Sequence, residues 1–275
     1  MRLSIVSDEI SRDFTEAIEF GIEWGIRDFE IRYLKSGRAP FISNDEILNL
    51  IKKKEERGVD ISVISPGLFQ ISLKDEVQLK LQIEDHIYES FRFAEKLETR
   101  NVIIFGFKRY SKEPQTNYIQ VVHILGRMAA LAERYGFNLL LENYPSTWAD
   151  TGANTAMILD DVNSKNLMAN WDPANARWSG EIPYPYGYLA IRKHVFSIHV
   201  KDLRERKNLE PEIVVVGEGD IDWGGQLRAV LTESITRYIT IETHCKPLIE
   251  NSQRNLLNIM DLLENIELDE KCINK

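Results

Sequence analysis

Cysteine is scarce in this 275-residue sequence: there are two, Cys245 and Cys272, and both lie near the C-terminal end. Two late cysteines cannot form the disulfide framework of a small secreted domain, and they exclude a metal site built on several thiolates. A chain with so few cysteines is typical of a reducing compartment. We therefore expect a cytoplasmic protein.

Long apolar runs are lacking as well. No segment comes near the ~18 consecutive apolar residues that a membrane-spanning helix requires. The apolar run within residues 1–10 is shorter than the hydrophobic part of a secretory signal peptide. We therefore expect no membrane partner.

Basic residues are outnumbered by acidic ones, at 34 Lys and Arg against 43 Asp and Glu, which gives a net charge of -9. Neutralising a nucleic-acid backbone requires a basic surface, so this balance argues against nucleic acid as the main partner.

A glycine-rich turn after the first apolar run is absent too. That absence argues against an open doubly wound sheet with a dinucleotide site.

The sequence does contain a repeated unit, in which a helical pattern follows a short apolar run. In the first unit, Phe14, Ala17 and Ile18 recur at helical spacing behind a buried run at residues 2–6. The predicted strands cover residues 2–6, 28–32, 59–64, 101–105, 137–142, 167–172, 195–199 and 238–242, and the predicted helices cover residues 13–24, 44–57, 75–97, 116–135, 154–163, 184–192, 223–234 and 250–263. Eight such units are typical of a single-domain α/β protein, a (β/α)8 TIM barrel over residues 1–275.

The last four predicted strands end in residues that can bind a metal ion or carry a proton: Glu142, Asp172, His199 and Glu242. In a parallel barrel the carboxyl ends of the strands face one mouth, so we expect these side chains to converge. Three carboxylates and an imidazole suit one divalent ion, namely Mn²⁺, Mg²⁺, Co²⁺ or Zn²⁺. Each residue taken singly is equally suited to a helix cap or an ion pair, but the set of four indicates a metal site.

Five motifs surround these residues: Leu-Glu-Asn at 141–143, Trp-Asp-Pro-Ala-Asn at 171–175, Ile-His-Val-Lys-Asp at 198–202, Gly-Glu-Gly-Asp-Ile-Asp-Trp at 217–223 and Ile-Glu-Thr-His at 241–244. In this order they resemble the xylose isomerase-like TIM barrel superfamily, in particular its sugar phosphate isomerase/epimerase members. The opening Ser-Asp-Glu-Ile-Ser is similar too, so the resemblance covers essentially the whole chain. It implies that Glu142, Asp172, His199 and Glu242 hold one divalent ion, with the two glutamates also acting as the acid/base pair.

The implied activity is isomerisation or epimerisation of a small sugar or sugar phosphate. A carbon acid beside a carbonyl loses a proton, and a metal ion stabilises the enediolate that forms. A dehydratase of the same superfamily, acting on an inosose or related keto-polyol, would share all four ligands and expel a β-hydroxyl instead. The superfamily's DNA-repair endonucleases need further histidines on earlier strand ends, where this chain has Ile64-Ser65 and Phe105-Gly106.

Asn175 marks a departure from the family pattern. The sugar 3-epimerases of the superfamily resemble this chain in the four ligands but carry a histidine three residues beyond the aspartate, at the position of Asn175. The departure argues against a free-ketohexose epimerase. It leaves Asn175 as a neutral hydrogen-bonding residue for a substrate hydroxyl.

Four other residues are candidates for binding substrate. Lys201 and Arg204 would hold an anionic group such as phosphate or carboxylate, or else belong to a solvated charge cluster. His244 is expected on the same strand face as the last metal-site glutamate, with a capping or surface role as the alternative. Glu30, at the end of the second strand, either touches substrate or forms an ion pair with Arg32.

Aromatic residues gather in the loops after the fifth and sixth strands, at Trp148, Trp171, Trp178 and residues 183–186. They either stack on a sugar face or form a lid or a contact between subunits, and we favour contact. The sequence is therefore compatible with a homo-oligomer.

Overall fold

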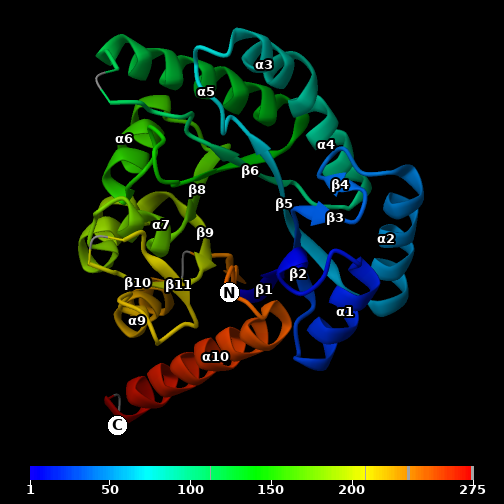
Figure 1. Ribbon diagram of the computed structural model, residues 1–275, viewed down its shortest axis with the longest axis vertical. Helices are drawn as coiled ribbons and strands as arrows, with labels where there is room; N and C mark the ends of the chain where they lie inside the picture. Colours follow the sequence, from blue (N-terminus) through cyan, green and yellow to red (C-terminus); the bar gives the residue numbers. More distant parts are fainter. Residues whose placement is uncertain (112, 208, 234–235, 274–275) are drawn as a thin grey trace.

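Eight parallel strands close into a barrel at the centre of the structure (Figure 1). The computed structural model describes residues 1–111, 113–207, 209–233 and 236–273, and side chains up to residue 268. The barrel strands are β1 (Arg2–Val6), β2 (Asp28–Ile31), β5 (Asp60–Leu68), β6 (Asn101–Phe105), β7 (Asn138–Glu142), β8 (Leu167–Trp171), β9 (Val195–Val200) and β12 (Tyr238–Ile241). Their order around the barrel is β1, β12, β9, β8, β7, β6, β5, β2, and β2 pairs with β1. The predicted (β/α)8 TIM barrel is confirmed.

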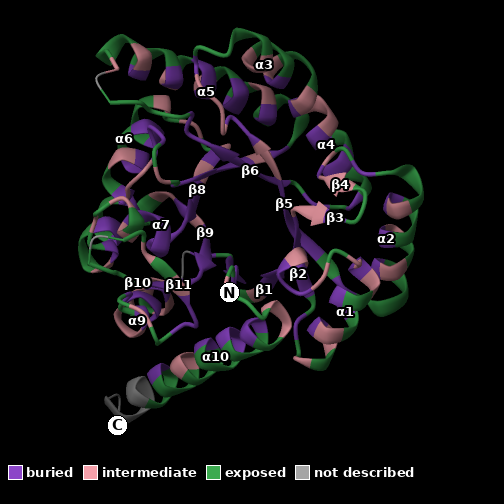
Figure 2. Cartoon of the chain, viewed as in Figure 1, coloured by how far each residue is buried: buried purple, intermediate pink, exposed green. Residues whose placement is uncertain are grey.

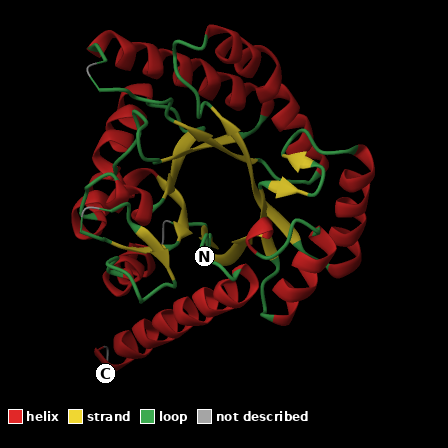
Figure 3. Cartoon of the chain, in the orientation of Figure 1, coloured by secondary structure: helices red, strands yellow, loops and turns green. Residues whose placement is uncertain are grey.

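Helices surround the barrel on the outside (Figure 3). They are α1 (Phe14–Glu23), α2 (Asn44–Arg57), α3 (Glu76–Leu81), α4 (Ile87–Lys96), α5 (Gln115–Tyr135), α6 (Gly152–Val162), α7 (Pro173–Trp178), α8 (Tyr188–Ile191), α9 (Trp223–Glu233) and α10 (Leu248–Ile273). The predicted helix at 44–57 coincides with α2, and Gly58 ends it in the left-handed conformation at φ 61° that favours glycine. Each helix in the described ranges is too short or too polar to cross a lipid bilayer.

The predicted helix at 184–192 is wrong in its first half. Pro183–Gly187 forms an irregular turn in which Tyr184 is extended, at φ -121° and ψ 133°. A residue before proline is driven out of the helical region by the proline ring, and Pro185 follows here. Regular helix is limited to α8, and a 3₁₀ turn at Arg192–His194 leads into β9.

Two other predicted helices differ in form. The helix expected at 75–97 consists of α3 and α4 joined by a π turn at Gln82–His86. The helix expected at 250–263 continues as α10, where Ile266 is still buried against the core. Ser234, the predicted end of a helix, lies outside the described residues, and so does the side chain of Cys272.

Two small hairpins at the barrel mouth were not predicted. One pairs β3 (Tyr33–Leu34) with β4 (Gly37–Arg38), and the other pairs β10 (Asp202–Arg204) with β11 (Glu212–Val214). Strands of two or three residues are too short to leave a period-two pattern in a sequence. Both hairpins extend loops that follow barrel strands, so they add surface beside the site.

Buried residues form two hydrophobic clusters. The larger one lies between the strands and the helices, where Figure 2 shows the inner helix faces buried and the outer faces exposed. The smaller one consists of Val63, Ile103, Phe105 and Leu140, from β5, β6 and β7. Leu140 is two residues before Glu142, so both share one face of β7. The small cluster therefore fills the barrel beneath the polar end.

We predict that Phe29→Ala lowers the free energy of unfolding by about 3–5 kcal/mol, because it empties a fully buried site in the larger cluster. Phe29 also packs edge-on against Phe14, with ring centroids 5.8 Å apart. Urea denaturation followed by circular dichroism measures the change. Leu48→Ala, at a position that is 65% exposed, is the control and should alter stability by less than about 0.5 kcal/mol. Equal effects of the two substitutions would contradict this packing.

Candidate active site

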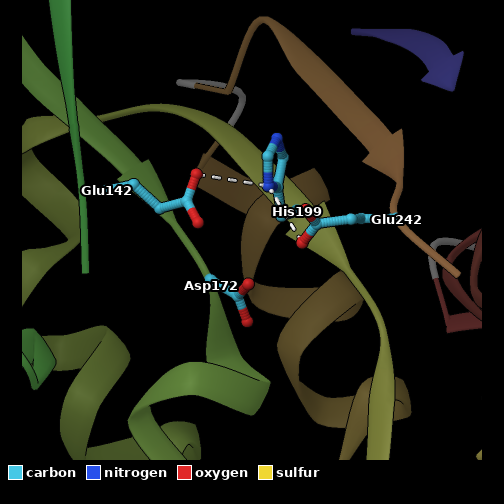
Figure 4. Close-up of side chains that lie close together, drawn as sticks. All are labelled: Glu142, Asp172, His199 and Glu242. Carbon is cyan, nitrogen blue, oxygen red and sulfur yellow. Dashed lines mark ion pairs between the residues drawn. The ribbon is translucent and has the colours of Figure 1, made fainter. Parts of the chain in front are cut away.

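Polar side chains from four strand ends meet at one end of the barrel (Figure 4). Glu142 is the last residue of β7, and Asp172 directly follows β8. His199 lies near the end of β9, and Glu242 directly follows β12. One ligand atom from each residue lies within 4.8 Å of those of the other three, and all four residues are buried. The structure thus brings together the four residues that the sequence directs to one mouth.

His199 stands between the two glutamates of this cluster. Its Nδ1 is 3.5 Å from Glu142 Oε2 and 3.4 Å from Glu242 Oε2 (Figure 4). Its Nε2 is 2.9 Å from Glu30 Oε2. A ring nitrogen bonded to a carboxylate carries a proton, so in the neutral ring, the form that binds a metal ion, the lone pair is on Nδ1. Nδ1 is buried and lacks a hydrogen-bond partner among the described residues, as fits a metal-binding nitrogen.

The negative charge of the carboxylates in and around this cluster exceeds the positive charge of the neighbouring cations. Burial alone would lower the pKa of His199, but the negative charges of Glu30, Glu142 and Glu242 outweigh burial and raise that pKa well above its usual value. Buried carboxylates require positive charge nearby, because they have lost the solvation of water. A divalent cation with oxygen and nitrogen ligands meets this requirement, so the residues present fit the metal ion that the sequence predicts.

Three cationic side chains contact Glu242. Lys201 Nζ donates to its Oε2 at 2.7 Å, and Arg32 Nη1 donates to its Oε1 at 2.7 Å. His244 Nε2 lies 3.2 Å from the same Oε1. Burial would raise the pKa of Glu242, but the positive charges of Lys201 and His244 hold it well below its usual range. These positive charges therefore favour the ionised form of Glu242.

Glu142 has a different environment. Desolvation raises its pKa to about 7, although the positive charge of His199 opposes that shift. Its nearest hydrogen-bond donors are neutral: Asn170 Nδ2 donates to Oε2 at 3.1 Å, and Asn175 Nδ2 donates to Oε1 at 3.4 Å. Glu142 can therefore exchange a proton near neutral pH. Two carboxylates with such different pKa values are suited to different roles in proton transfer.

Asp172 is both a helix cap and a member of the cluster. Its Oδ1 accepts from the backbone N–H of Asn175 at 2.9 Å, at the N-terminus of α7. Its Oδ2 accepts from Lys201 Nζ at 2.5 Å. Asn143 holds the backbone of Asp172 from both sides, with 2.8 Å hydrogen bonds to its N–H and its carbonyl. The capping alternative for this residue is therefore correct, and the cap fixes the carboxylate within the cluster.

A cleft gives access to the cluster through two adjoining cavities. The large cavity, of about 870 Å³, is lined by loops after β6 and β7 and by Asn175, Lys201 and His244. The small cavity, of about 340 Å³, is lined by Glu142 and Glu242 and again by Lys201 and His244. Because they share lining residues, the two cavities form one cleft whose polar end lies at the carboxylates. The cleft has the size of a site for a small ligand.

Two of the predicted substrate contacts lie elsewhere than the sequence indicated. Glu30 is 1% exposed and its Oε2 bonds to His199, so it supports the histidine, and the ion pairs of Arg32 are formed with Asp8, Glu9 and Glu242 instead. Arg204 is exposed on β10, and its Nε donates to the carbonyl oxygen of Glu218 at 3.2 Å. The hairpin turns this side chain away from the cleft. Asn175, Lys201 and His244, the other three candidates, line the cleft as described above.

Three residues of this region were missed as site residues. Arg32 Nη2 donates to Asp8 Oδ2 at 2.9 Å and to Glu9 Oε1 at 2.6 Å, and His244 Nδ1 lies 2.7 Å from Glu9 Oε1. Burial would raise the pKa of Glu9, but the hydrogen bond with His244 and the charge of Arg32 lower it to about 2. These acids position Arg32 and His244, two of the three cations that contact Glu242. Asp8 and Glu9 lie two and three residues after the end of β1, so the strand-end signal could have identified them.

One curated relative and two solved structures are similar to this chain. A 3-dehydroshikimate dehydratase from Bacillus anthracis is 23% identical over 217 residues, which cover 75% of this chain and 74% of that protein. The structure of an L-ribulose 3-epimerase matches with a TM-score of 0.79 at 17% identity and covers 100% of this chain and 98% of its own. The IolI protein, whose crystal structure holds a zinc atom, matches with a TM-score of 0.76 at 16% identity, with coverages of 97% and 98%.

The two structural matches share the fold at low sequence identity. A family profile identifies the family of the chain: the profile described as xylose isomerase-like TIM barrel matches residues 18–266. That range includes all four residues of the cluster and seven of the eight barrel strands complete. The chain belongs to the xylose isomerase-like TIM barrel family.

Proposed function

We propose that this protein is a divalent-metal-dependent isomerase or epimerase that removes a proton next to the carbonyl of a small sugar or sugar phosphate. The observation that carries the proposal is the placement of Glu142 and Glu242, which flank His199 at 3.5 and 3.4 Å and line the same cavity. Carboxylates that approach a bound substrate from two sides can remove a proton at one position and return it at another.

The roles of the two glutamates differ in this proposal. Glu142, with a pKa raised to about 7 by burial, exchanges a proton with the substrate carbon from one side. Glu242, held ionised between Lys201 and Arg32, is the base on the other side. Lys201 lines the cleft, and its ammonium group, bonded to Asp172 and Glu242, keeps positive charge close to where the substrate oxygens would lie.

Glu142, Asp172, His199 and Glu242 would hold the metal ion. Bound there, a divalent ion supplies positive charge beside the carbonyl oxygen of the substrate. The donor set suits Mn²⁺, Mg²⁺, Co²⁺ or Zn²⁺, and the zinc atom of the structurally similar IolI protein supports a site of this kind.

Dehydration of a keto-polyol is the second candidate. The similarity to a 3-dehydroshikimate dehydratase favours it, as does Asn175, which stands where the sugar 3-epimerases have histidine. The first step is the same removal of a proton next to a carbonyl. The reactions diverge afterwards, because a dehydratase expels a β-hydroxyl and an isomerase or epimerase returns the proton to carbon.

We predict that the metal-loaded protein exchanges carbon-bound hydrogen of its substrate with deuterium from D2O. A panel of keto and aldo sugars, their phosphates, inososes and 3-dehydroshikimate is followed by mass spectrometry and by ultraviolet absorbance. Exchange with retention of the hydroxyl groups supports the isomerase or epimerase, whereas loss of water with a new conjugated chromophore supports the dehydratase. The absence of exchange in every compound would remove proton abstraction as the reaction.

We predict that Glu142→Gln lowers kcat by at least ~10²-fold, the usual contribution of a general acid or base, while bound metal is retained. The amide keeps an oxygen for the metal ion but cannot accept the proton. Glu242→Gln should lower kcat by a similar factor and weaken metal binding too, because it leaves Lys201 and Arg32 without their shared anion. Near-normal turnover of Glu142→Gln at saturating metal would show that Glu142 only binds the ion.

We predict that elemental analysis finds about one divalent ion per chain. The affinity for this ion should depend on Glu30, although Glu30 would not touch the ion. Glu30→Gln should weaken binding by about 10–100-fold, because Glu30 orients His199. His199→Ala should weaken binding more without unfolding the barrel.

Asp28→Asn is the matched control, since Asp28 is a buried acid on the same strand at the opposite end of the barrel. It should leave metal affinity unchanged in a calorimetric titration. If Glu30→Gln binds metal as tightly as the control, the hydrogen bond to His199 does not serve the metal site.

A further inference from the structure

The small cavity contains two arginines that the proposed proton transfer does not use. Arg12 and Arg38 both lie against the ring of Tyr33, with their guanidinium carbons 4.9 and 5.1 Å from the ring centroid. All three residues line the cavity that also contains Glu142 and Glu242. A ligand at the carboxylates therefore extends towards a pair of guanidinium groups.

Arg38 is held in a defined position. Its Nε donates to the carbonyl oxygen of Ser65 at 3.2 Å, and its Nη1 is 3.4 Å from the hydroxyl oxygen of Tyr33. Its guanidinium group also packs on Gly67, where a Cβ atom would lie 2.5 Å from Arg38 Cζ. Gly67 has φ +78°, so both the backbone and the neighbouring arginine favour glycine there. The glycine near the end of β5 thus leaves room for this side chain.

Neither arginine forms an ion pair with a carboxylate in the described part of the chain. Asp8, one of the acids on the cavity wall, already has partners: its Oδ2 accepts from Arg32 and its Oδ1 from the backbone N–H of Tyr33. The protein as a whole is acidic, with a net charge of -9. Two unpaired cations at the polar end of a cleft in such a protein are well placed to attract and bind an anion.

We propose that Arg12 and Arg38 bind an anionic group of the substrate, a carboxylate or a phosphate, while the carbonyl end of the same molecule lies at Glu142. The proposal rests on the proposed function for the identity of the ligand as substrate. Guanidinium groups match both anions through paired N–H donors. Lys201, which the sequence suggested for this role, is committed to Asp172 and Glu242.

The test compares matched probes with and without the anionic group, by isothermal titration calorimetry on the metal-loaded protein. One pair is D-ribulose 5-phosphate and D-ribulose, and the other is 3-dehydroshikimate and its methyl ester. The wild-type protein should bind the anion of at least one pair more tightly than its neutral partner. Arg38→Met should weaken the binding of that anion by about 10–100-fold, the value of a charged hydrogen bond, and leave the neutral partner unaffected. The pair that shows the preference identifies phosphate or carboxylate as the anion.

Arg12→Met should reduce the same preference, and Arg38→Lys should retain part of it because the charge remains. Arg109→Met is the matched control: Arg109 lines the large cavity and stacks on Trp148 with its guanidinium carbon 4.5 Å from the ring centroid. Circular dichroism and metal content check that each variant is folded and loaded. The absence of an anion preference in the wild type, or a preference removed by Arg109→Met and not by Arg38→Met, overturns the proposal.

Failure of this inference is distinguishable from failure of the proposed function, because affinity is measured without turnover. An anion preference that depends on Arg38, in a protein that exchanges deuterium with none of the panel, supports the anion site and rejects the proton transfer. Exchange of neutral sugars alone, with Arg38→Met binding them like the wild type, supports the proton transfer and rejects the anion site.

Discussion

Burial of several carboxylates at one end of a closed barrel is the constraint on which the site depends. Glu30, Glu142, Asp172 and Glu242 are each at most 5% exposed. Lys201 and Arg32 compensate part of this charge, mainly at Glu242, whereas Glu142 is bonded by neutral amides and has its pKa raised to about 7 by burial. This uneven distribution of positive charge separates one carboxylate that can change its protonation from another that stays ionised.

The sequence was sufficient to predict the barrel and the convergence of the four residues, for a physical reason. Parallel strands buried on both faces appear as short apolar runs, and their carboxyl ends face the same mouth. A polar residue such as Glu142 at the end of such a run is therefore placed by the fold itself. The register agrees, since Glu142 is paired with Phe105 on one side and with Asn170 on the other.

Contacts across the barrel could not be predicted in the same way. Glu30 and His199 lie on β2 and β9, which are separated in the barrel by β1 and β12, so neither spacing nor strand pairing indicates that they touch. Arg204 was expected at the site because it is close to His199 in sequence. The hairpin of β10 and β11 instead turns it outwards, where it bonds to the carbonyl oxygen of Glu218. Arg38 is near the carboxylates only because β3 and β4 fold a loop of β2 over the mouth.

We propose that the buried cluster is a metal centre with His199 Nδ1 as its nitrogen ligand. Anomalous diffraction from crystals grown with Zn²⁺ tests this assignment. We expect one strong peak at about 2.0–2.1 Å from His199 Nδ1 and about 2.0–2.2 Å from carboxylate oxygens of the cluster, with Nε2 still bonded to Glu30. A zinc-loaded crystal with no peak between Glu142 and Glu242, or with His199 bound through Nε2, would contradict it.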